Sequence, residues 1–311
     1  MRVMVTGGAG FIGSQVAQAY ADAGHEVLVL DNLSSGKKEN VPEGAKFVFG
    51  EIQSDTAAEA IRTFRPEVVN HHAAQINVRK SVEDPVFDAQ VNILGSLTLL
   101  EAARKNGVRK FIFSSSGGAG YGEQEYFPAD EKHPLRPVSP YGVAKVAVEN
   151  YMHYYKVQYG LEYTALRYAN VYGPRQDPFG EAGVVAIFCT RLLKGQTAII
   201  NGDGEQTRDY VYVGDVVRAN VEALTRGDGL SINIGTALET DVNELFRKLR
   251  ELSGSGQEEI HGPGMPGEQR RSVIDNRLAY DELGWYPNML LDDGLALTLA
   301  YFRDKAKSSN R

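Results

Sequence analysis

The sequence predicts an α/β fold, in which a doubly wound parallel sheet carries helices on both faces and a smaller C-terminal lobe follows. Up to Tyr168, short apolar segments typical of strands alternate with amphipathic segments typical of helices. Beyond Tyr168, glycine, proline and charged residues are dense between Gly173 and Gly183, and the later regular segments are shorter. The length of 311 residues suits one large domain with a smaller lobe.

The expected strands of the large domain are short and apolar, at 3–5, 26–30, 46–49, 67–70, 110–114 and 162–168. Helices are expected between them, at about 16–23, 57–64, 86–105 and 140–159. Further along we expect helices near 184–194, 215–225 and 241–252 and strands near 197–200 and 208–213. Segment 231–234 is placed to return to the main sheet. The large domain is therefore expected at 1–170 with 210–236 added, and the lobe at 171–209 and 237–311.

The turn after the first strand reads TGGAGFIG at residues 6–13. Glycines there let the backbone approach a pyrophosphate, and the N-terminus of the next helix faces the phosphate charge. The second strand ends in Asp31, about 20 residues downstream, where a carboxylate binds the adenosine ribose hydroxyls. A tight turn that binds nothing does not require this acid, so the segment predicts a dinucleotide site.

Asp31 also distinguishes between the two nicotinamide cofactors. A carboxylate accepts hydrogen bonds from a free 2′-hydroxyl and repels a 2′-phosphate, whereas an arginine binds the phosphate. Asn32 and Leu33 follow, and Lys37 and Lys38 lie too far along the chain to be phosphate ligands. The sequence therefore favours NAD over NADP.

Composition argues against several partners. The net charge of −7 argues against nucleic acid or an anionic membrane, so an anionic substrate requires local positive groups. The single cysteine, Cys189, allows no intrachain disulfide and fits a cytoplasmic protein. The N-terminus is expected to be a strand and not a signal peptide, and no apolar segment reaches the length of a membrane span.

Tyr141 and Lys145 stand four residues apart at the start of an expected helix, just after Ser139-Pro140. Residues at this spacing share one helix face, so the ammonium can lie beside the phenol. A phenol with the usual pKa of about 10 is a poor base at neutral pH, and a neighbouring cation is expected to lower that pKa. The serines at 114–116 end a strand, where ligands of doubly wound sheets bind, and one hydroxyl is placed to contact the reacting oxygen.

These motifs resemble those of the extended short-chain dehydrogenase/reductase family over nearly the whole chain, and most of all those of the UDP-glucose 4-epimerases. The resemblance also rests on His72-Ala73-Ala74, on Val91-Asn92 with Gly95, and on RYANVYGP at 167–174 and RDYVYV at 208–213. It implies a Rossmann-type domain with tightly bound NAD. It also implies a homodimer formed through a four-helix contact of the helices expected at 86–105 and 140–159.

The resemblance further implies roles for the matching residues. Tyr141 is the acid/base, Lys145 binds the nicotinamide ribose and tunes Tyr141, and Ser116 is their hydroxyl partner. The residues implied at the cofactor, besides Tyr141 and Lys145, are Gly7, Gly10, Phe11, Ile12, Gly13, Asp31, Asn32, Glu51, Ile52, Ala73, Ala74, Asn92, Ser114 and Tyr168. Those implied at the nucleotide sugar are Ser116, Asn170, Val184, Arg208, Arg271 and Ser272, of which Asn170 and Arg208 hold the diphosphate.

The implied reaction inverts C4 of UDP-glucose or UDP-galactose through a transient 4-keto sugar. Tyr141 removes the proton of the 4-hydroxyl, NAD takes the hydride from C4, and the hydride returns to the opposite face. A 4,6-dehydratase of the family carries an acid beside the hydroxyl partner, whereas Gly117 and Gly118 stand here. A UDP-glucuronate epimerase or decarboxylase stays open, and so does a catalytically silent NAD-binding sensor or scaffold.

Some positions depart from the family pattern. Glu51-Ile52 stands where aspartate usually contacts adenine, and Met265 stands where an arginine often binds the nucleotide phosphate. Arg270-Arg271 is placed to compensate for that missing arginine. Ser272 falls where a bulky side chain restricts some epimerases to unacetylated sugars, so we expect UDP-N-acetylhexosamines to be accepted.

Two clusters are expected to have no part in the chemistry. His71-His72 ends a strand and has no further metal ligands at suitable spacing, so core packing is expected. Tyr151, Tyr154, Tyr155 and Tyr159 recur at helical spacing and predict a packing or dimer face.

Overall fold

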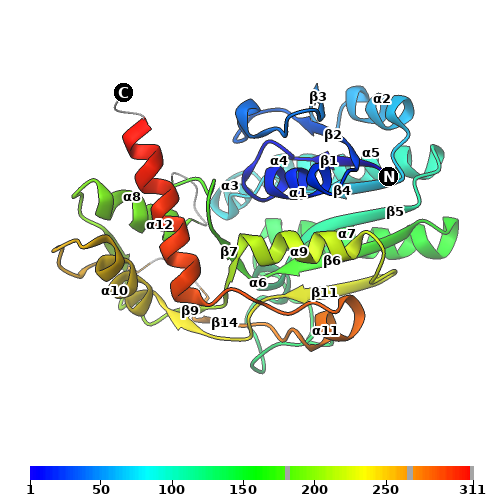
Figure 1. Ribbon diagram of the computed structural model, residues 1–311. Helices are drawn as coiled ribbons and strands as arrows, with labels where there is room; N and C mark the ends of the chain where they lie inside the picture. Colours follow the sequence, from blue (N-terminus) through cyan, green and yellow to red (C-terminus); the bar gives the residue numbers. More distant parts are fainter. Residues whose placement is uncertain (179–182, 265–268, 309–311) are drawn as a thin grey trace.

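The computed structural model describes residues 1–178, 183–264 and 269–308, and over these ranges the chain forms a seven-stranded parallel sheet (Figure 1). The strands lie in the order β11-β6-β5-β4-β1-β2-β3: β2 and β3 are added on one side of β1, and the later strands, beginning with β4, on the other side. This order confirms the expected doubly wound sheet. The strand bounds are β1 Arg2–Thr6, β2 Glu26–Asp31, β3 Lys46–Phe49, β4 Val68–His71, β5 Lys110–Ser116, β6 Glu162–Tyr168 and β11 Leu230–Ile234.

Helices cover both faces of the sheet. On one face α2, α5 and α7 share an apolar core that includes Leu99 and Met152. On the other face α1, α9 and α11 share a core that includes Val16 and Trp285. The helix bounds are α1 Phe11–Asp22, α2 Asp55–Phe64, α5 Gly95–Lys105, α7 Pro140–Tyr159, α9 Val213–Ala223 and α11 Arg277–Leu283.

The central strands are apolar at successive positions because both of their faces are covered. In β1, Met4 belongs to the core under α2, α5 and α7, while Val3 and Val5 belong to the core under α1 and α9. Strand side chains alternate between the two faces, so each of these residues has apolar neighbours and none is accessible to solvent.

The helix expected over 86–105 is present but interrupted. It consists of α4 (Pro85–Ala89), a wider π turn over Gln90–Leu94 and α5. Asp84 caps its start by accepting a hydrogen bond from the backbone N–H of Phe87. The π turn contains the buried Asn92, in keeping with the frequent occurrence of such turns at functional sites.

Beyond β6 the chain forms helices that pack around their own core, which includes Phe188 and Phe246. These helices, α8 (Val184–Leu193), α10 (Val242–Ser253) and α12 (Leu291–Ser308), lie together at one end of the main sheet (Figure 1). Small sheets accompany them, formed by β7 Asn170–Tyr172 with β10 Tyr210–Tyr212, by β8 Ile199–Asn201 with β13 Ile260–Gly262, and by β9 Thr207–Arg208 with β12 Thr240–Asp241 and β14 Arg271–Ser272.

The prediction of a single strand over 208–213 is wrong, because the segment forms two short strands on either side of Asp209. β9 ends at Arg208 and pairs with β12 and β14, whereas β10 begins at Tyr210 and pairs with β7. Asp209 lies between the two strands and is buried. Its hydrogen bonds, described below, explain the break.

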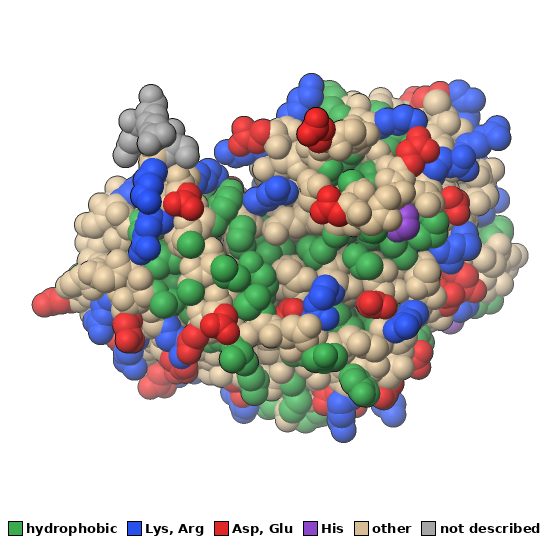
Figure 2. All heavy atoms as spheres, viewed as in Figure 1, with side chains coloured by type: hydrophobic (Ala, Val, Ile, Leu, Met, Phe, Trp, Pro, Cys, Tyr) green, Lys and Arg blue, Asp and Glu red, His purple; other side chains and the backbone are tan. Residues whose placement is uncertain are grey.

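On the face shown in Figure 2, basic and acidic side chains are interspersed, with no extended area of one sign. No helix among the described residues has both the length and the apolarity that a membrane crossing requires.

Candidate active site

The glycine turn between β1 and α1 is held by its own backbone. Gly7 adopts a φ of +67°, which favours glycine, and its carbonyl accepts a hydrogen bond from Gly10 N–H at 3.1 Å. A Cβ on Gly13 would collide with the same carbonyl oxygen. Gly10 caps α1 without a side chain, and the first turn of the helix carries no acidic residue. The N-terminal N–H groups of α1 therefore suit an anionic group such as a pyrophosphate.

Asp31 ends β2 beside this turn. Its carboxylate accepts the backbone N–H of Ala9 at 2.9 Å and that of Leu33 at 2.8 Å. The side-chain oxygen of Asn32 accepts the backbone N–H of Ser34. Glu51 follows shortly after the end of the neighbouring strand β3. Asp31 thus fixes the shape of the turn, and its oxygens keep lone pairs for the ribose hydroxyls expected there.

The segment after β4 closes on the glycine turn. A Cβ on Gly7 would lie 2.6 Å from the backbone nitrogen of Ala73, which itself donates to Thr6 Oγ1 at 3.3 Å. His71 is buried and hydrogen-bonds Thr6 and Ser96, at 2.7 and 2.9 Å. This is the core packing expected for it. Across the described residues, no cluster of three or more His, Cys, Asp or Glu side chains could hold a metal ion.

An amide network lies beside Ala73-Ala74. Asn92 exchanges two hydrogen bonds with the backbone of Gln75, and the side chains of both residues donate to Asp88 Oδ1 at 2.9 Å. Asp88 is buried, and this desolvation raises the pKa of its carboxyl group. The network fixes the loop after Ala74 and sets a carboxylate against α7.

Tyr141 and Lys145 occupy one face of the first turns of α7, as their spacing predicts. Pro140 starts the helix, and Ser139 caps it by accepting Gly142 N–H at 3.1 Å. Lys145 Nζ lies 5.5 Å from the centre of the Tyr141 ring. It donates to the carbonyl of Ser114 at 2.7 Å, at the carboxyl end of β5. Backbone contacts thus place the ammonium beside the phenol.

The expectation that Lys145 lowers the pKa of Tyr141 is not met by this structure. Burial raises the pKa of Tyr141, and the nearby carboxylate of Asp88 raises it further. Burial also lowers the pKa of Lys145 to about 8, opposed by the carboxylates of Asp88 and Glu149. Desolvation penalises the charged form of each group, and it is the largest cause of both shifts.

Ser116 ends β5 and begins the short helix α6 (Gly117–Tyr121), accepting Ala119 N–H at 3.3 Å. A Cβ on Gly142 would collide with the carbonyl of Ala119, so α6 lies directly against the start of α7. Ser114, Ser116 and the Tyr141–Lys145 pair therefore lie together at the carboxyl edge of the sheet.

Glu149 is a site-supporting residue that the sequence did not reveal. It lies one turn beyond Lys145, accepts Ser115 Oγ–H at 2.5 Å, and pairs with Arg167 of β6 at 2.6 Å. Arg167 also donates to Tyr121 of α6 at 3.0 Å. This buried network ties α7 to β5, β6 and α6. The repeated four-residue spacing from Tyr141 through Lys145 to Glu149, which places the three residues on one face of the helix, could have indicated Glu149 from the sequence.

The residues expected at the diphosphate and sugar come together from distant parts of the chain. Ser272 pairs with Arg208 between β14 and β9, and the backbone N–H of Asn170 donates to Asp209 at 2.8 Å. A Cβ on Gly118 would lie 3.3 Å from Ser272 Oγ. Ser272 thus faces the loop after Ser116, at the same end of the sheet as Tyr141.

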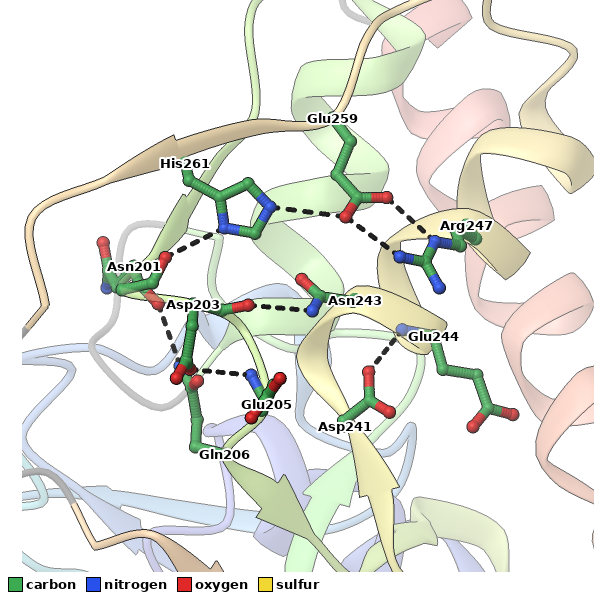
Figure 3. Close-up of polar contacts among 11 residues, drawn as sticks. Asn201, Asp203, Glu205, Gln206, Asp241, Asn243, Glu244, Arg247, Glu259 and His261 are labelled. Carbon is green, nitrogen blue, oxygen red and sulfur yellow. Dashed lines mark hydrogen bonds and ion pairs between the residues drawn. The ribbon is translucent and has the colours of Figure 1, made fainter.

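Arg271 and Arg270 are both engaged with carboxylates in this structure. Arg271 lies over the Phe127 ring and pairs with Glu239 at 2.7 Å, and Arg270 pairs with Asp203 at 2.8 Å. Asp203 belongs to a polar cluster that also includes Glu259 and His261 (Figure 3).

Val184 and Ile52, implied by the resemblance, are placed less directly, and the departure at Met265 is not placed at all. Val184 begins α8 and is half-buried against its core. Ile52 is buried under α5. Met265 lies outside the described residues.

A profile described as the NAD dependent epimerase/dehydratase family matches residues 3–235. The chain belongs to this family. Its structure is similar to that of the UDP-glucose 4-epimerase from Thermotoga maritima with UDP-glucose: the two share 52% identity and superpose with a TM-score of 0.96, over 98% of this chain and 100% of the other.

Two further family members were solved with other ligands. The UDP-glucose 4-epimerase from Thermus thermophilus, in complex with NAD, shares 46% identity at a TM-score of 0.92, over 97% of this chain and 99% of the other. The UDP-N-acetylglucosamine 4-epimerase from Methanobrevibacter ruminantium, in complex with UDP-N-acetylmuramic acid, shares 34% sequence identity with this chain. The two superpose with a TM-score of 0.93, over 98% of each chain. Membership of an NAD-dependent family confirms the expected cofactor.

Proposed function

We propose that this protein is an NAD-dependent UDP-hexose 4-epimerase that interconverts UDP-glucose and UDP-galactose. The observation that carries the proposal is the Tyr141–Lys145 pair on one face of α7, anchored on the carbonyl of Ser114. The likeness to an epimerase solved with UDP-glucose supports it over the full length of the chain. Gly117 and Gly118 stand where a dehydratase of the family carries an acid, which disfavours dehydration.

The residues present fit NAD. The uncapped N-terminus of α1 and the glycines at 7, 10 and 13 suit its pyrophosphate, and Asp31 suits its adenosine ribose. Lys145 and the segment 73–75, held by Asn92, flank the carboxyl end of β5, where the nicotinamide ribose is proposed to bind. The other implied cofactor residues are proposed to line the same edge of the sheet.

The reaction proposed for this site divides between the protein and its cofactor. Tyr141 removes the proton from the sugar 4-hydroxyl and returns it after inversion, with Ser116 hydrogen-bonded to the same oxygen. The Lys145 ammonium stabilises the phenolate while it carries its proton, which the pKa of about 8 permits at neutral pH. NAD when bound supplies the hydride chemistry at C4.

Segments 171–209 and 237–311 are proposed to bind the nucleotide sugar. Arg208 and Asn170 are proposed to hold the diphosphate, because a guanidinium binds phosphate oxygens through several donors at once. For a 2-acetamido group, the relevant feature is Ser272, which faces Gly118 and whose small side chain is proposed to leave room beside the sugar. The likeness to a UDP-N-acetylglucosamine 4-epimerase supports this wider range of substrates.

A homodimer is proposed through α4, the π turn and α7. Apolar side chains are exposed along these segments, including Val86, Leu94, Val143 and Tyr154. A hollow of about 520 Å³ beside them is lined by Ile93, Pro140 and further residues of α4 and α7, which would accommodate side chains of a second copy. Tyr155, also expected on a packing or dimer face, is buried within the protein, where its hydroxyl donates to Glu101.

A cytoplasmic location is also proposed. The lone Cys189 is buried, which fits that location.

The decisive experiment follows turnover of UDP-glucose and UDP-galactose by NMR with no added NAD. The wild-type protein should interconvert them, whereas Tyr141→Phe should lose on the order of 10²- to 10⁴-fold in kcat and keep its NAD. Tyr280→Phe, at an exposed tyrosine of α11, is the matched control and should leave kcat unchanged. Full activity in Tyr141→Phe would contradict the acid/base assignment, and a wild-type protein inactive on both sugars would contradict the function.

A further inference from the structure

Asp209 breaks the strand that carries Arg208, and its carboxylate is buried. Only 1% of the residue is exposed, and burial raises the pKa of its carboxyl group to about 6. At neutral pH the group is therefore ionised, and it acts only as a hydrogen-bond acceptor. A buried carboxylate in this state requires donors around it.

Those donors come from two other segments of the chain. Thr236 donates both its backbone N–H, at 2.8 Å, and its hydroxyl, at 2.6 Å, to Oδ1. On the other oxygen, Oδ2, the backbone N–H of Ala237 lies at 3.1 Å and that of Ile274 at 3.5 Å. Ala237 has a φ of +60°, an unfavourable conformation for alanine that this contact helps to hold.

The backbone of Asp209 joins the remaining segments. Its N–H donates to the carbonyl of Ser272 at 2.9 Å, and its carbonyl accepts the N–H of Asn170 at 2.8 Å. One residue therefore connects the segments that carry Asn170, Arg208 and Ser272 with the loop at 235–237. A Cβ on Gly235 would lie 2.5 Å from Oδ2, so this loop approaches the carboxylate as closely as a glycine allows.

We propose that Asp209 is a positioning residue for the nucleotide diphosphate. By holding Thr236, Ala237 and Ile274, its carboxylate keeps Asn170 and Arg208 at the relative positions in which both contact the two phosphates. Asp209 itself does not touch the substrate. The proposal rests on the proposed function, because it takes Asn170 and Arg208 as the diphosphate ligands.

Asp209→Asn tests the proposal with nearly no change in shape. The amide oxygen can still accept from Thr236. The NH₂ group then faces the backbone N–H groups of Ala237 and Ile274, so the hydrogen bonds from these two residues are lost. KM for UDP-glucose should rise about tenfold, as the loss of one or two hydrogen bonds implies, while kcat changes by less than about twofold. The affinity for UDP, measured by calorimetry on the NAD-loaded protein, should weaken by the same factor as KM.

Thr236→Val is the second variant and removes a single donor. It keeps the backbone N–H and the side-chain volume, so it should fold even if Asp209→Asn does not, and KM should rise about threefold. Asp241→Asn is the matched control. Asp241 is a half-buried residue of the same small sheet, and its carboxylate caps α10 (Figure 3). Asparagine caps helices equally well, so KM should stay unchanged.

The outcomes separate the inference from the function on which it rests. If the wild-type protein binds UDP and epimerises UDP-glucose but both variants keep the wild-type KM and UDP affinity, Asp209 does not position the diphosphate ligands. A fall in kcat and NAD content together with the rise in KM would also overturn the proposal, since it would indicate a general structural role. A wild-type protein that neither binds UDP nor turns over UDP-glucose would instead contradict the proposed function.

Discussion

The glycine turn and the proposed diphosphate surface are built in different ways. The turn at 6–13 is one continuous segment fixed by its own backbone, with Gly7 at positive φ and Gly13 packed on its carbonyl. The surface that carries Asn170, Arg208 and Ser272 consists of short strands separated by dozens of residues in sequence, joined through Asp209. The first arrangement depends mainly on local backbone geometry, with Asp31 and Ala73 in contact with the turn, whereas the second depends entirely on segments that folding brings together.

The difference shows what kind of substitution each half should tolerate. In the glycine turn the limiting factor is space around the backbone, so adding a single methyl group should be harmful. In the diphosphate surface the limiting factor is the set of hydrogen bonds that hold separate strands together. There, an exchange that removes a hydrogen bond should be harmful even when it preserves the volume of the side chain.

The largest effect is expected from Gly13→Ala. The added Cβ collides with the Gly7 carbonyl and cannot be accommodated without opening the turn, so NAD binding and turnover should fall by more than about 100-fold. Gly256→Ala is the matched control because nothing lies within 4 Å of its added Cβ. NAD content is measured from cofactor released on denaturation, and a wild-type content in Gly13→Ala would show that the turn does not hold the pyrophosphate.

Arg208→Lys and Arg271→Lys compare two arginines of the diphosphate half. Lysine cannot donate two parallel hydrogen bonds, so Arg208→Lys should raise KM for UDP-glucose by about 10- to 100-fold. Arg271 is half-exposed and paired with Glu239, and its exchange should change KM by less than about threefold. Steady-state kinetics measure both values. Equal effects in the two variants would assign Arg271 to the diphosphate as well.

The pH dependence of kcat tests the catalytic pair. Tyr141 can accept a proton only as the phenolate, and burial together with Asp88 raises its pKa, so the Tyr141–Lys145 pair must first lose one proton. Because the pKa of Lys145 is about 8, kcat should rise with pH up to about pH 8 and then level off, where the pair shares its single remaining proton. In Asp88→Asn the rise should occur at lower pH, because the Asp88 carboxylate raises the pKa of both groups. An unchanged pH profile would show that Asp88 does not act on the pair.

The smallest effect on UDP-glucose is expected from Ser272→Leu. Ser272 is buried against Gly118, so a larger side chain there should extend into the proposed sugar site. Turnover of UDP-N-acetylglucosamine should fall at least about tenfold, while that of UDP-glucose, which has no acetamido group, should change less. The ratio of the two kcat/KM values measures this. A wild-type protein that does not turn over UDP-N-acetylglucosamine would remove the basis for the prediction.

Much of the fold could be predicted because its signals are periodic and local. The strands over 46–49 and 162–168 and the helix over 140–159 have the predicted bounds, since each is delimited by turn residues or by a cap such as Ser139. The short helix over Gly117–Tyr121 was missed because three of its five residues are glycines, and only packing against α7 explains it. The break at Asp209 was missed because RDYVYV has the composition of one strand.

The candidate site also combines features that local sequence predicts with features that it does not. The spacing of Tyr141 and Lys145 is enough to place them on one helix face, and the structure confirms that arrangement. The sign of the pKa shift at Tyr141 was not predictable from that spacing, because burial and the Asp88 carboxylate act from outside the motif. Asp88 and Asp209 leave no local pattern. Their roles depend on which segments pack around them, and a sequence does not show that directly.

Gly235 has a consequence for how this protein can change over generations. The space that its side chain would occupy is closed by Asp209, by Ile274 and by Ala169, which come from three different segments. An alanine at 235 requires that both Asp209 and Ile274 shift or become smaller, because each lies less than 3 Å from the added Cβ. Positions 209, 235 and 274 should therefore vary together among descendants of this gene, and an alignment of such sequences should show them as one correlated group.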